Sequence, residues 1–236
     1  MKPVRLAAGF LTVGAWTFLS RVFGFARDIM IAAFLGAGPV AEAFLIAFSL
    51  PNLFRRFFGE GAFNMAFIPM FSKRLERDEN AGEFMNEAFA ALGTLLIVFT
   101  LIGTVAMPWL VVAMASGFIG DARFDLAVHF GRIAFPYILF ISLAALLSGV
   151  LNATGRFAVA AAAPVLLNVL FIGAMVVADT LGLDIGLALA WAVPVAGIAQ
   201  LALLWRGAAR AGYAPRLVRP RLTPQIRRLA IVAAPA

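Results

Sequence analysis

Charged side chains lie inside stretches of this chain that are otherwise apolar enough to cross a lipid bilayer. They are Arg21, Arg27, Asp28, Arg55 and Arg56. A charged side chain at the bilayer centre costs about 2.5–3.5 kcal/mol on insertion scales, so four lipid-facing arginines would cost on the order of 10 kcal/mol. We therefore expect these guanidinium groups to face a protein interior or a hydrated cavity. Such a cavity favours an anion, and the planar guanidinium fork suits phosphate well.

The composition indicates a multi-pass membrane protein. Of the 236 residues, 63% are hydrophobic and 13% are charged, whereas soluble domains carry about 25% charged residues. The net charge of +7 does not indicate nucleic acid, because the basic residues cluster between apolar runs, as the positive-inside rule describes. Cysteine is absent and His129 is the single histidine, which excludes disulfides, thiolate metal ligands and a histidine-based metal cluster.

Six apolar runs are long enough to cross a bilayer, which takes about 20 residues. They cover residues 6–35, 41–71, 84–113, 126–151, 157–178 and 185–204. We expect Pro51, Gly59 and Gly61 to interrupt the second run. The predicted loops are residues 36–39, 73–83, 117–125, 152–156 and 179–184. The predicted fold class is all-α, a polytopic membrane bundle of six transmembrane helices plus the start of a seventh.

Lysine and arginine concentrate on one side of these predicted spans. The basic segments are the N-terminus, the loop at 73–83, the turn at 152–156 and the segment after residue 205. This asymmetry predicts a cytoplasmic N-terminus. We divide the chain into a six-helix lobe (1–205), a basic cytoplasmic linker (206–228) and the first turns of helix seven (229–236). We therefore expect it to be one lobe of a longer transporter.

The charged residues form a pattern along the first two runs. Arg21 and Asp28 are nearly two helical turns apart, so they share a face with Gly24 between them. A narrow polar stripe on an apolar helix is typical of a cavity wall. The second run adds Asn52, Arg55, Arg56 and Glu60. Interrupted membrane helices commonly build transporter binding sites.

Structural explanations compete with a binding role. In one alternative, Arg55 and Arg56 reach the lipid headgroups from the end of a short span. In another, Arg27 and Asp28 form a structural ion pair near the outer interface. Glu60 is equally compatible with a helix-breaking loop. Arg21 lies near the middle of its run and is the hardest to explain structurally.

No catalytic motif is apparent in the sequence. It contains no Gly-rich phosphate loop ending in Lys-Ser/Thr, no Ser/His/Asp arrangement and no paired carboxylates. No loop is long enough for a soluble catalytic domain. We therefore predict a transporter rather than an enzyme. We expect no metal and no cofactor, with membrane potential, an ion gradient or downhill exchange driving transport.

The polar stretches resemble those of a known family. Residues 20–28 (SRVFGFARD), 35–38 (LGAG), 50–63 (LPNLFRRFFGEGAF) and 66–69 (AFIP) resemble the MurJ (MviN) family of lipid II flippases, in the multidrug/oligosaccharidyl-lipid/polysaccharide (MOP) exporter superfamily. Shorter matches follow in order at residues 135–139, 142–143, 151–152, 156–157, 163–164, 167–168 and 187–193. The resemblance implies two six-helix lobes around a central cavity, with this chain as the N-terminal lobe.

The resemblance also implies roles for particular residues. The family's cationic cavity residues correspond to Arg21, Arg27 and Arg55, with Asp28 and Arg56 beside them. Supporting positions are Ser20, Gly24, Glu42, Asn52 and Glu60. Glu42 stands where the family has Asp, which keeps the carboxylate. Ser49 stands where a Lys is often found, so one cavity charge is missing.

The implied function is movement of lipid II, an undecaprenyl-pyrophosphate-linked muropeptide, from the inner to the outer leaflet of the bacterial cytoplasmic membrane. By alternating access, the arginines would hold the pyrophosphate in a hydrated cavity while the tail stays in lipid. Expected partners are lipid II, membrane lipids and cell-wall synthesis proteins, with no nucleic acid. The alternatives are another MOP exporter of drugs or lipid-linked saccharides, and a scaffold for cell-wall synthesis that moves nothing.

Overall fold

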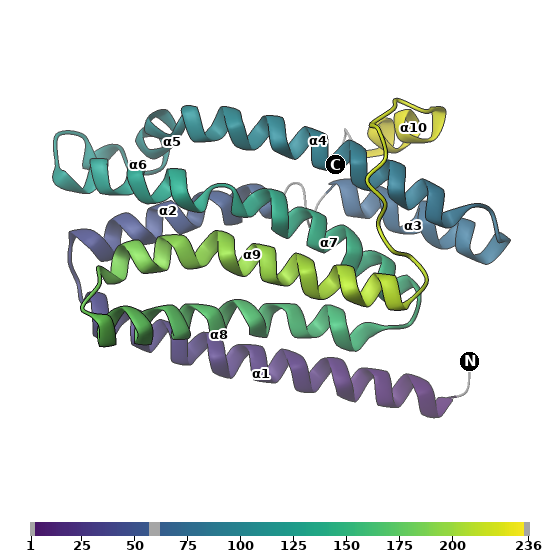
Figure 1. Ribbon diagram of the computed structural model, residues 1–236, viewed down its shortest axis with the longest axis horizontal. Helices are drawn as coiled ribbons and strands as arrows, with labels where there is room; N and C mark the ends of the chain where they lie inside the picture. The colour runs from purple at the N-terminus through teal and green to yellow at the C-terminus, as the bar shows by residue number, and fades with distance from the viewer. Residues whose placement is uncertain (1–2, 57–61, 234–236) are drawn as a thin grey trace.

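The computed structural model describes residues 3–56 and 62–233, and their side chains at 11–56 and 63–233. These residues form an elongated bundle in which most helices run side by side (Figure 1). The described residues contain helices and no strands. The all-α prediction is therefore confirmed.

The helices follow the predicted apolar runs, and most are separated by the predicted turns. Their bounds are α1 (Pro3–Leu35), α2 (Pro39–Arg55), α3 (Ala62–Arg77), α4 (Ala81–Val105), α5 (Met107–Met114), α6 (Ala122–Ala134), α7 (Tyr137–Ala153), α8 (Phe157–Leu181), α9 (Ile185–Arg210) and α10 (Pro224–Ala233), with a 3-10 turn at Ser116–Phe118. Between α1 and α2, Gly36 has φ +62°, a left-handed conformation that glycine adopts without strain. The predicted loop at 36–39 is therefore a tight turn.

Four of the described helical segments are long and apolar enough to cross a membrane. They are Ala81–Val105, Ala122–Ala153, Phe157–Leu181 and Ile185–Arg210, and they overlap the third to sixth predicted spans. The segment Ala122–Ala153 contains both α6 and α7, which meet at Pro136, a residue with no backbone N–H. The first two runs are not among these four, so the total of six spans stays a prediction.

The predicted interruption of the second run at Pro51 is wrong. Helix α2 continues through Pro51 to Arg55. Asn52 Nδ2 donates to the Phe48 carbonyl at 2.9 Å, whereas the carbonyl that Pro51 leaves without its helical donor is that of Ala47. Helix α3 begins at Ala62, and Gly59, Glu60 and Gly61 lie outside the described residues.

The predicted loop at 73–83 is also mostly helical. Helix α3 extends to Arg77 and α4 begins at Ala81, which leaves residues 78–80 as the turn. The last turns of α3 stay helical because they pack on the bundle: Phe71 is buried, and the Arg74 guanidinium lies 4.5 Å from the Phe84 ring centroid. Helix α9 likewise runs past residue 205 to Arg210, while the division into lobe, linker and seventh helix stays a prediction.

The first two helices do not pack along each other. Helix α1 packs mainly on α8, whereas α2 packs mainly on α6, and α7 packs on α9. Figure 1 shows α1 at one edge of the bundle, beside α8. The arginines of the first run and those of the second run are therefore carried by helices with different neighbours.

Phenylalanine rings tie the helices together. Phe67 stacks on Phe63, Phe71 and Phe84 with centroid distances of 6.1, 5.6 and 5.5 Å. This stack joins α3 to α4, and each aromatic pair contributes about 0.5–1.5 kcal/mol beyond its buried area. Rings that share a packed core restrict independent movement of the helices that carry them.

Large apolar side chains also cover much of the outer surface. Exposed examples are Phe18 and Phe25 on α1 and Leu101, Ile102 and Val105 on α4. A soluble monomer rarely exposes contiguous apolar patches of this kind, whereas lipid acyl chains cover them without cost. The outer surface is therefore that of a membrane protein.

We predict that Gly103 on α4 is required for close helix packing. A Cβ at Gly103 would overlap the ring of Phe135, so Gly103→Ala should destabilise the protein by about 1–3 kcal/mol. The control is Gly173→Ala on α8, where an added Cβ meets nothing within 4 Å. Thermal unfolding in detergent measures both variants, and equal melting temperatures would contradict the packing assignment.

Candidate functional site

The guanidinium of Arg27 is held by Asp28 of its own helix and by Asn168 and Phe171 of α8, and its Cζ lies 5.8 Å from the Phe171 ring centroid. Its Nε and Nη2 donate to Asp28 Oδ1 at 3.0 and 2.7 Å, and its Nη1 donates to Asn168 Oδ1 at 2.8 Å. The Arg27 side chain is 18% exposed and that of Asp28 is 63% exposed. The ion pair considered as a structural alternative therefore exists, and its carboxylate side is open to the surroundings.

Asn168 connects this arginine to the backbone of α1. Its Nδ2 donates to the Ser20 carbonyl at 3.0 Å, and the residue is only 5% exposed. The same nitrogen would lie 3.5 Å from a Cβ at Gly24. The structure thus brings Ser20, Gly24, Arg27 and Asp28 together around Asn168, to which we assigned no role from the sequence.

Arg21 faces a different environment, a groove of about 620 Å³ between α1, α7 and α8. Thr17, Ser20, Ser148 and Asn152 also line this groove, and no carboxylate does. No carboxylate of the described residues forms an ion pair with Arg21. The rest of the lining is apolar, and Arg21 itself is exposed. A cation beside hydroxyl and amide groups is suited to a phosphate or a hydroxylated ligand.

The second predicted pair of arginines lies at the end of α2. Arg55 is half-buried and Arg56 is exposed. Neither residue lines the groove that contains Arg21, which agrees with the packing of α2 on α6 rather than on α1. Glu60 is outside the described residues. The binding roles of Arg55, Arg56 and Asn52 stay predictions.

Glu42 forms an ion-pair cluster with α6 rather than with the predicted cavity arginines. Arg123 Nη1 lies 2.7 Å from Glu42 Oε2, and Arg123 Nη2 lies 2.7 Å from Asp121 Oδ2. Glu42 is in the first turn of α2, where the helix dipole favours a negative charge. The cluster therefore joins the start of α2 to the start of α6, and its role in transport stays a prediction.

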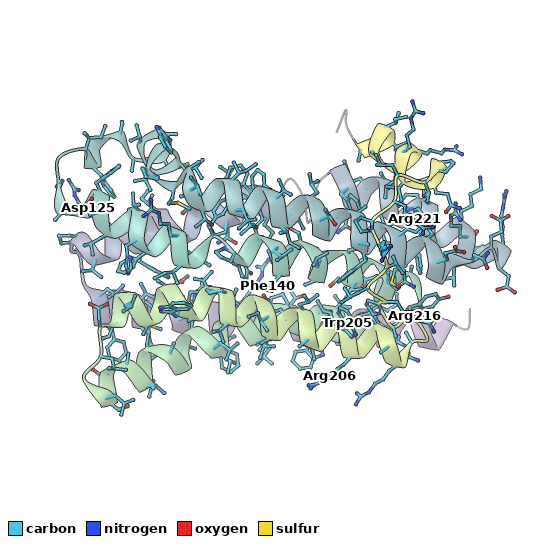
Figure 2. The ribbon with its side chains drawn as sticks, turned by 45° about the horizontal axis from the view of Figure 1, so that its top comes forward. Asp125, Phe140, Trp205, Arg206, Arg216 and Arg221 are labelled. Carbon is cyan, nitrogen blue, oxygen red and sulfur yellow. The ribbon has the colours of Figure 1, made fainter. Side chains whose placement is uncertain are left out.

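A second cavity, of about 770 Å³, lies between the first turns of α4 and the basic segment after α9. Arg216, Arg219 and Arg221 line it together with Glu83 and Glu87. Figure 2 shows Arg216 and Arg221 toward the end of the bundle opposite Asp125. Two glutamates therefore lie among these three arginines, whereas no acidic residue lines the groove at Arg21. Across residues 3–56 and 62–233, no group of three or more His, Cys, Asp or Glu could hold a metal ion.

Asn168 could have been found by the criterion that identified the arginines. It is a polar side chain within the apolar run at 157–178, where an unsatisfied amide is costly. Its partners could not be found in this way, because Ser20 and Arg27 lie far away in the sequence. Ser148 and Asn152 likewise reach the groove only through the packing of α7 beside α1 and α8.

We predict a pH-dependent contribution of Asp121 to stability. Hydrogen bonds from the side chain and the backbone N–H of Arg123 lower the pKa of Asp121 below its ordinary value of 3.8. A carboxyl group with a lowered folded-state pKa stabilises the protein above its unfolded pKa, and this contribution is lost as pH falls through the folded pKa. The Asp121→Asn variant should melt earlier than the parent protein at about pH 6, and the difference should shrink below about pH 4. A difference that stays constant across this range would refute the assignment.

The family comparison identifies the chain's relatives. The family described as lipid II flippase MurJ matches residues 31–236. A probable lipid II flippase MurJ of Rhizobium tropici is 44% identical over 240 residues, which cover 99% of this chain and 45% of that protein. The lipid II flippase MurJ of Burkholderia cenocepacia is 43% identical over 216 residues, covering 90% of this chain and 42% of that protein. The chain thus spans about half the length of the curated relatives it matches.

Solved structures show the same fold. A lipid II flippase MurJ in an inward closed conformation superposes with a TM-score of 0.76 at 20% identity, over 95% of this chain and 46% of that one. A MOP superfamily transporter from Pyrococcus furiosus superposes with a TM-score of 0.67 at 15% identity, over 96% of this chain and 51% of that one. At these identities the likeness establishes fold alone. The family match over residues 31–236 establishes more: the chain belongs to the lipid II flippase MurJ family.

Proposed function

We propose that this chain is the N-terminal lobe of a flippase that moves lipid II from the inner to the outer leaflet of the bacterial cytoplasmic membrane. The observation that carries the proposal is the groove at Arg21, where a cation lies among polar groups and no lining residue is acidic. The family name gives the substrate of the relatives, and the groove supplies matching chemistry. Lipid II carries a pyrophosphate, which arginine binds well.

Arg27 is the second proposed contact to the headgroup. A guanidinium has five N–H donors. Asp28 accepts one N–H from Nε and one from Nη2, and Asn168 accepts one from Nη1. One donor therefore remains on each terminal nitrogen. Because Asp28 is mostly exposed, water can solvate its carboxylate when a phosphate oxygen competes for Arg27. The ion pair is thus a reversible competitor that prevents the headgroup from binding too tightly to be released.

Transport in this proposal requires no covalent chemistry. The undecaprenyl tail stays in lipid beside the apolar outer surface while the headgroup occupies the groove. The second half that the relatives possess would supply the opposite wall, and rocking of the two halves would expose the headgroup to either side. We propose that the N-terminus is cytoplasmic, that membrane potential or an ion gradient drives the cycle, and that the partners are lipid II, membrane lipids and cell-wall synthesis proteins.

The rival functions predict different chemistry. An exporter of cationic drugs would require acidic groups in the groove, and the groove at Arg21 has none. A scaffold for cell-wall synthesis would bind its partners without moving lipid II. Translocation of lipid II by the reconstituted protein therefore separates the flippase from the scaffold.

We predict that Arg21, Arg27 and Arg55 are each needed for transport. The test is a chimera in which this chain replaces the matching 240 residues of the Rhizobium tropici relative, expressed in cells depleted of their own flippase. Replacing any of the three by alanine removes charge-assisted hydrogen bonds and should reduce lipid II translocation at least about tenfold, with loss of growth.

The matched control is Arg132→Ala, since Arg132 is exposed on α6 and is not among the proposed contacts. This variant should support growth and translocation. Each variant must reach the membrane in equal amount, as measured by immunoblotting. Normal growth and normal translocation by all three test variants would refute the proposed site.

A further inference from the structure

We infer that Asn168 is a positioning residue for Arg27, in that its amide fixes the direction in which a substrate-binding guanidinium points. The inference rests on the proposed function, because it assigns a partner to one of the proposed headgroup contacts. Asn168 lies on α8 and Arg27 on α1, so the contact also depends on how these two helices pack.

The hydrogen-bonding chemistry of its two partners fixes the orientation of the Asn168 amide. Arg27 can only donate, so it requires the amide oxygen, and the Ser20 carbonyl can only accept, so it requires the amide nitrogen. The observed distances are 2.8 Å from Nη1 to Oδ1 and 3.0 Å from Nδ2 to the Ser20 oxygen. Rotating the amide by half a turn would break both bonds. One side chain therefore locks the guanidinium relative to the α1 backbone.

The surface of α1 is shaped to receive this amide. Ser20 and Arg27 are seven residues apart, nearly two helical turns, and Gly24 lies between them with no side chain. The Asn168 nitrogen would be 3.5 Å from a Cβ at Gly24, an ordinary van der Waals distance, so the amide lies directly beside this position. Ser20, Gly24 and Arg27 on α1 thus form the surface on which Asn168 of α8 packs.

A buried amide side chain can join two helices without a hydrogen bond to an arginine. Gln200 on α9 illustrates this: it is 3% exposed, and its Nε2 donates to the Ala163 carbonyl of α8 at 2.8 Å. Its other recorded partner is the Tyr137 hydroxyl at 3.4 Å. Asn168 differs because its oxygen accepts from a charged group that is also proposed to meet the substrate. Gln200 is therefore a matched control for a purely structural role.

Loss of Asn168 should affect Arg27 before it affects the rest of the bundle. An arginine side chain has considerable rotamer freedom, and the Asn168 contact restricts it. Without this contact, the Asp28 carboxylate and the Phe171 ring remain as partners of Arg27, and Asp28 can draw the guanidinium toward itself. The guanidinium would then be directed away from a phosphate group, so headgroup affinity would fall.

The test uses the purified chimera described above and measures lipid II binding and thermal unfolding. The Asn168→Leu variant should bind lipid II about tenfold more weakly, as expected for a lost hydrogen bond to a charged group. The Gln200→Leu variant also loses a buried amide and should melt earlier, but its affinity should stay within about twofold, since it leaves the guanidinium in place. In an Arg27→Ala background, Asn168→Leu should cause no further loss of affinity.

A second variant covers the case in which Asn168→Leu does not fold. Asn168→Asp keeps an acceptor for Arg27 but loses the donor to Ser20 and adds a charge that competes with phosphate. It should remain folded and bind lipid II at least about tenfold more weakly. Unchanged affinity in this variant would overturn the inference.

Other outcomes separate this inference from the proposed function. If Arg27→Ala weakens lipid II binding but Asn168→Leu does not, the positioning role is wrong and the substrate site stands. If Asn168→Leu weakens binding equally with and without Arg27, Asn168 acts only through the packing of α1 on α8, and the positioning role is again wrong. If Arg27→Ala binds lipid II normally, Arg27 is not a headgroup contact and the positioning role fails, while the Arg21→Ala variant still tests the proposed site at the groove.

Discussion

The cost of placing a guanidinium in apolar surroundings underlies the arrangement of this lobe. Each of three arginines meets that cost in a different way. Arg123 is paired with Glu42 and Asp121. Arg27 contacts one carboxylate, one amide and the Phe171 ring. Arg21 is exposed beside a groove whose lining contains no carboxylate. Compensation of charge thus decreases from Arg123 to Arg21, and the least compensated cation is the best placed to attract an anionic ligand.

Helix α1 combines two requirements that usually conflict. Close packing on α8 requires small residues and satisfied hydrogen bonds, whereas a ligand requires donors that are still available. The stripe at Ser20, Gly24 and Arg27 meets both, because Asn168 accepts only one N–H, from Nη1, and one N–H remains on each terminal nitrogen of the guanidinium. Stacked rings join α3 to α4, while α1 packs on α8 and α8 packs on α9. Movement of the lobe as a unit would carry this site with it, as alternating access requires.

The sequence predicted the helical class and most turns well, because apolar runs and glycine or proline turns are local signals. It was less accurate where tertiary contacts override local tendency. Pro51 lies inside α2, and the charged end of α3 stays helical because Phe71 and Arg74 pack on the bundle. It also gave no hint that α1 and α2 would separate, since hydropathy does not specify which helices become neighbours.

By itself the sequence determined that arginines would lie among membrane helices, since the cost of exposing them to lipid follows from composition and spacing alone. It also determined the short polar stripe on α1, because helical periodicity is local. Only the tertiary structure decided which arginine is paired with carboxylates and which is available to bind an anionic ligand. That choice depends on Asn168 of α8 and on Asp121 and Arg123 at the start of α6, residues brought to α1 and α2 by the packing of helices distant in the chain.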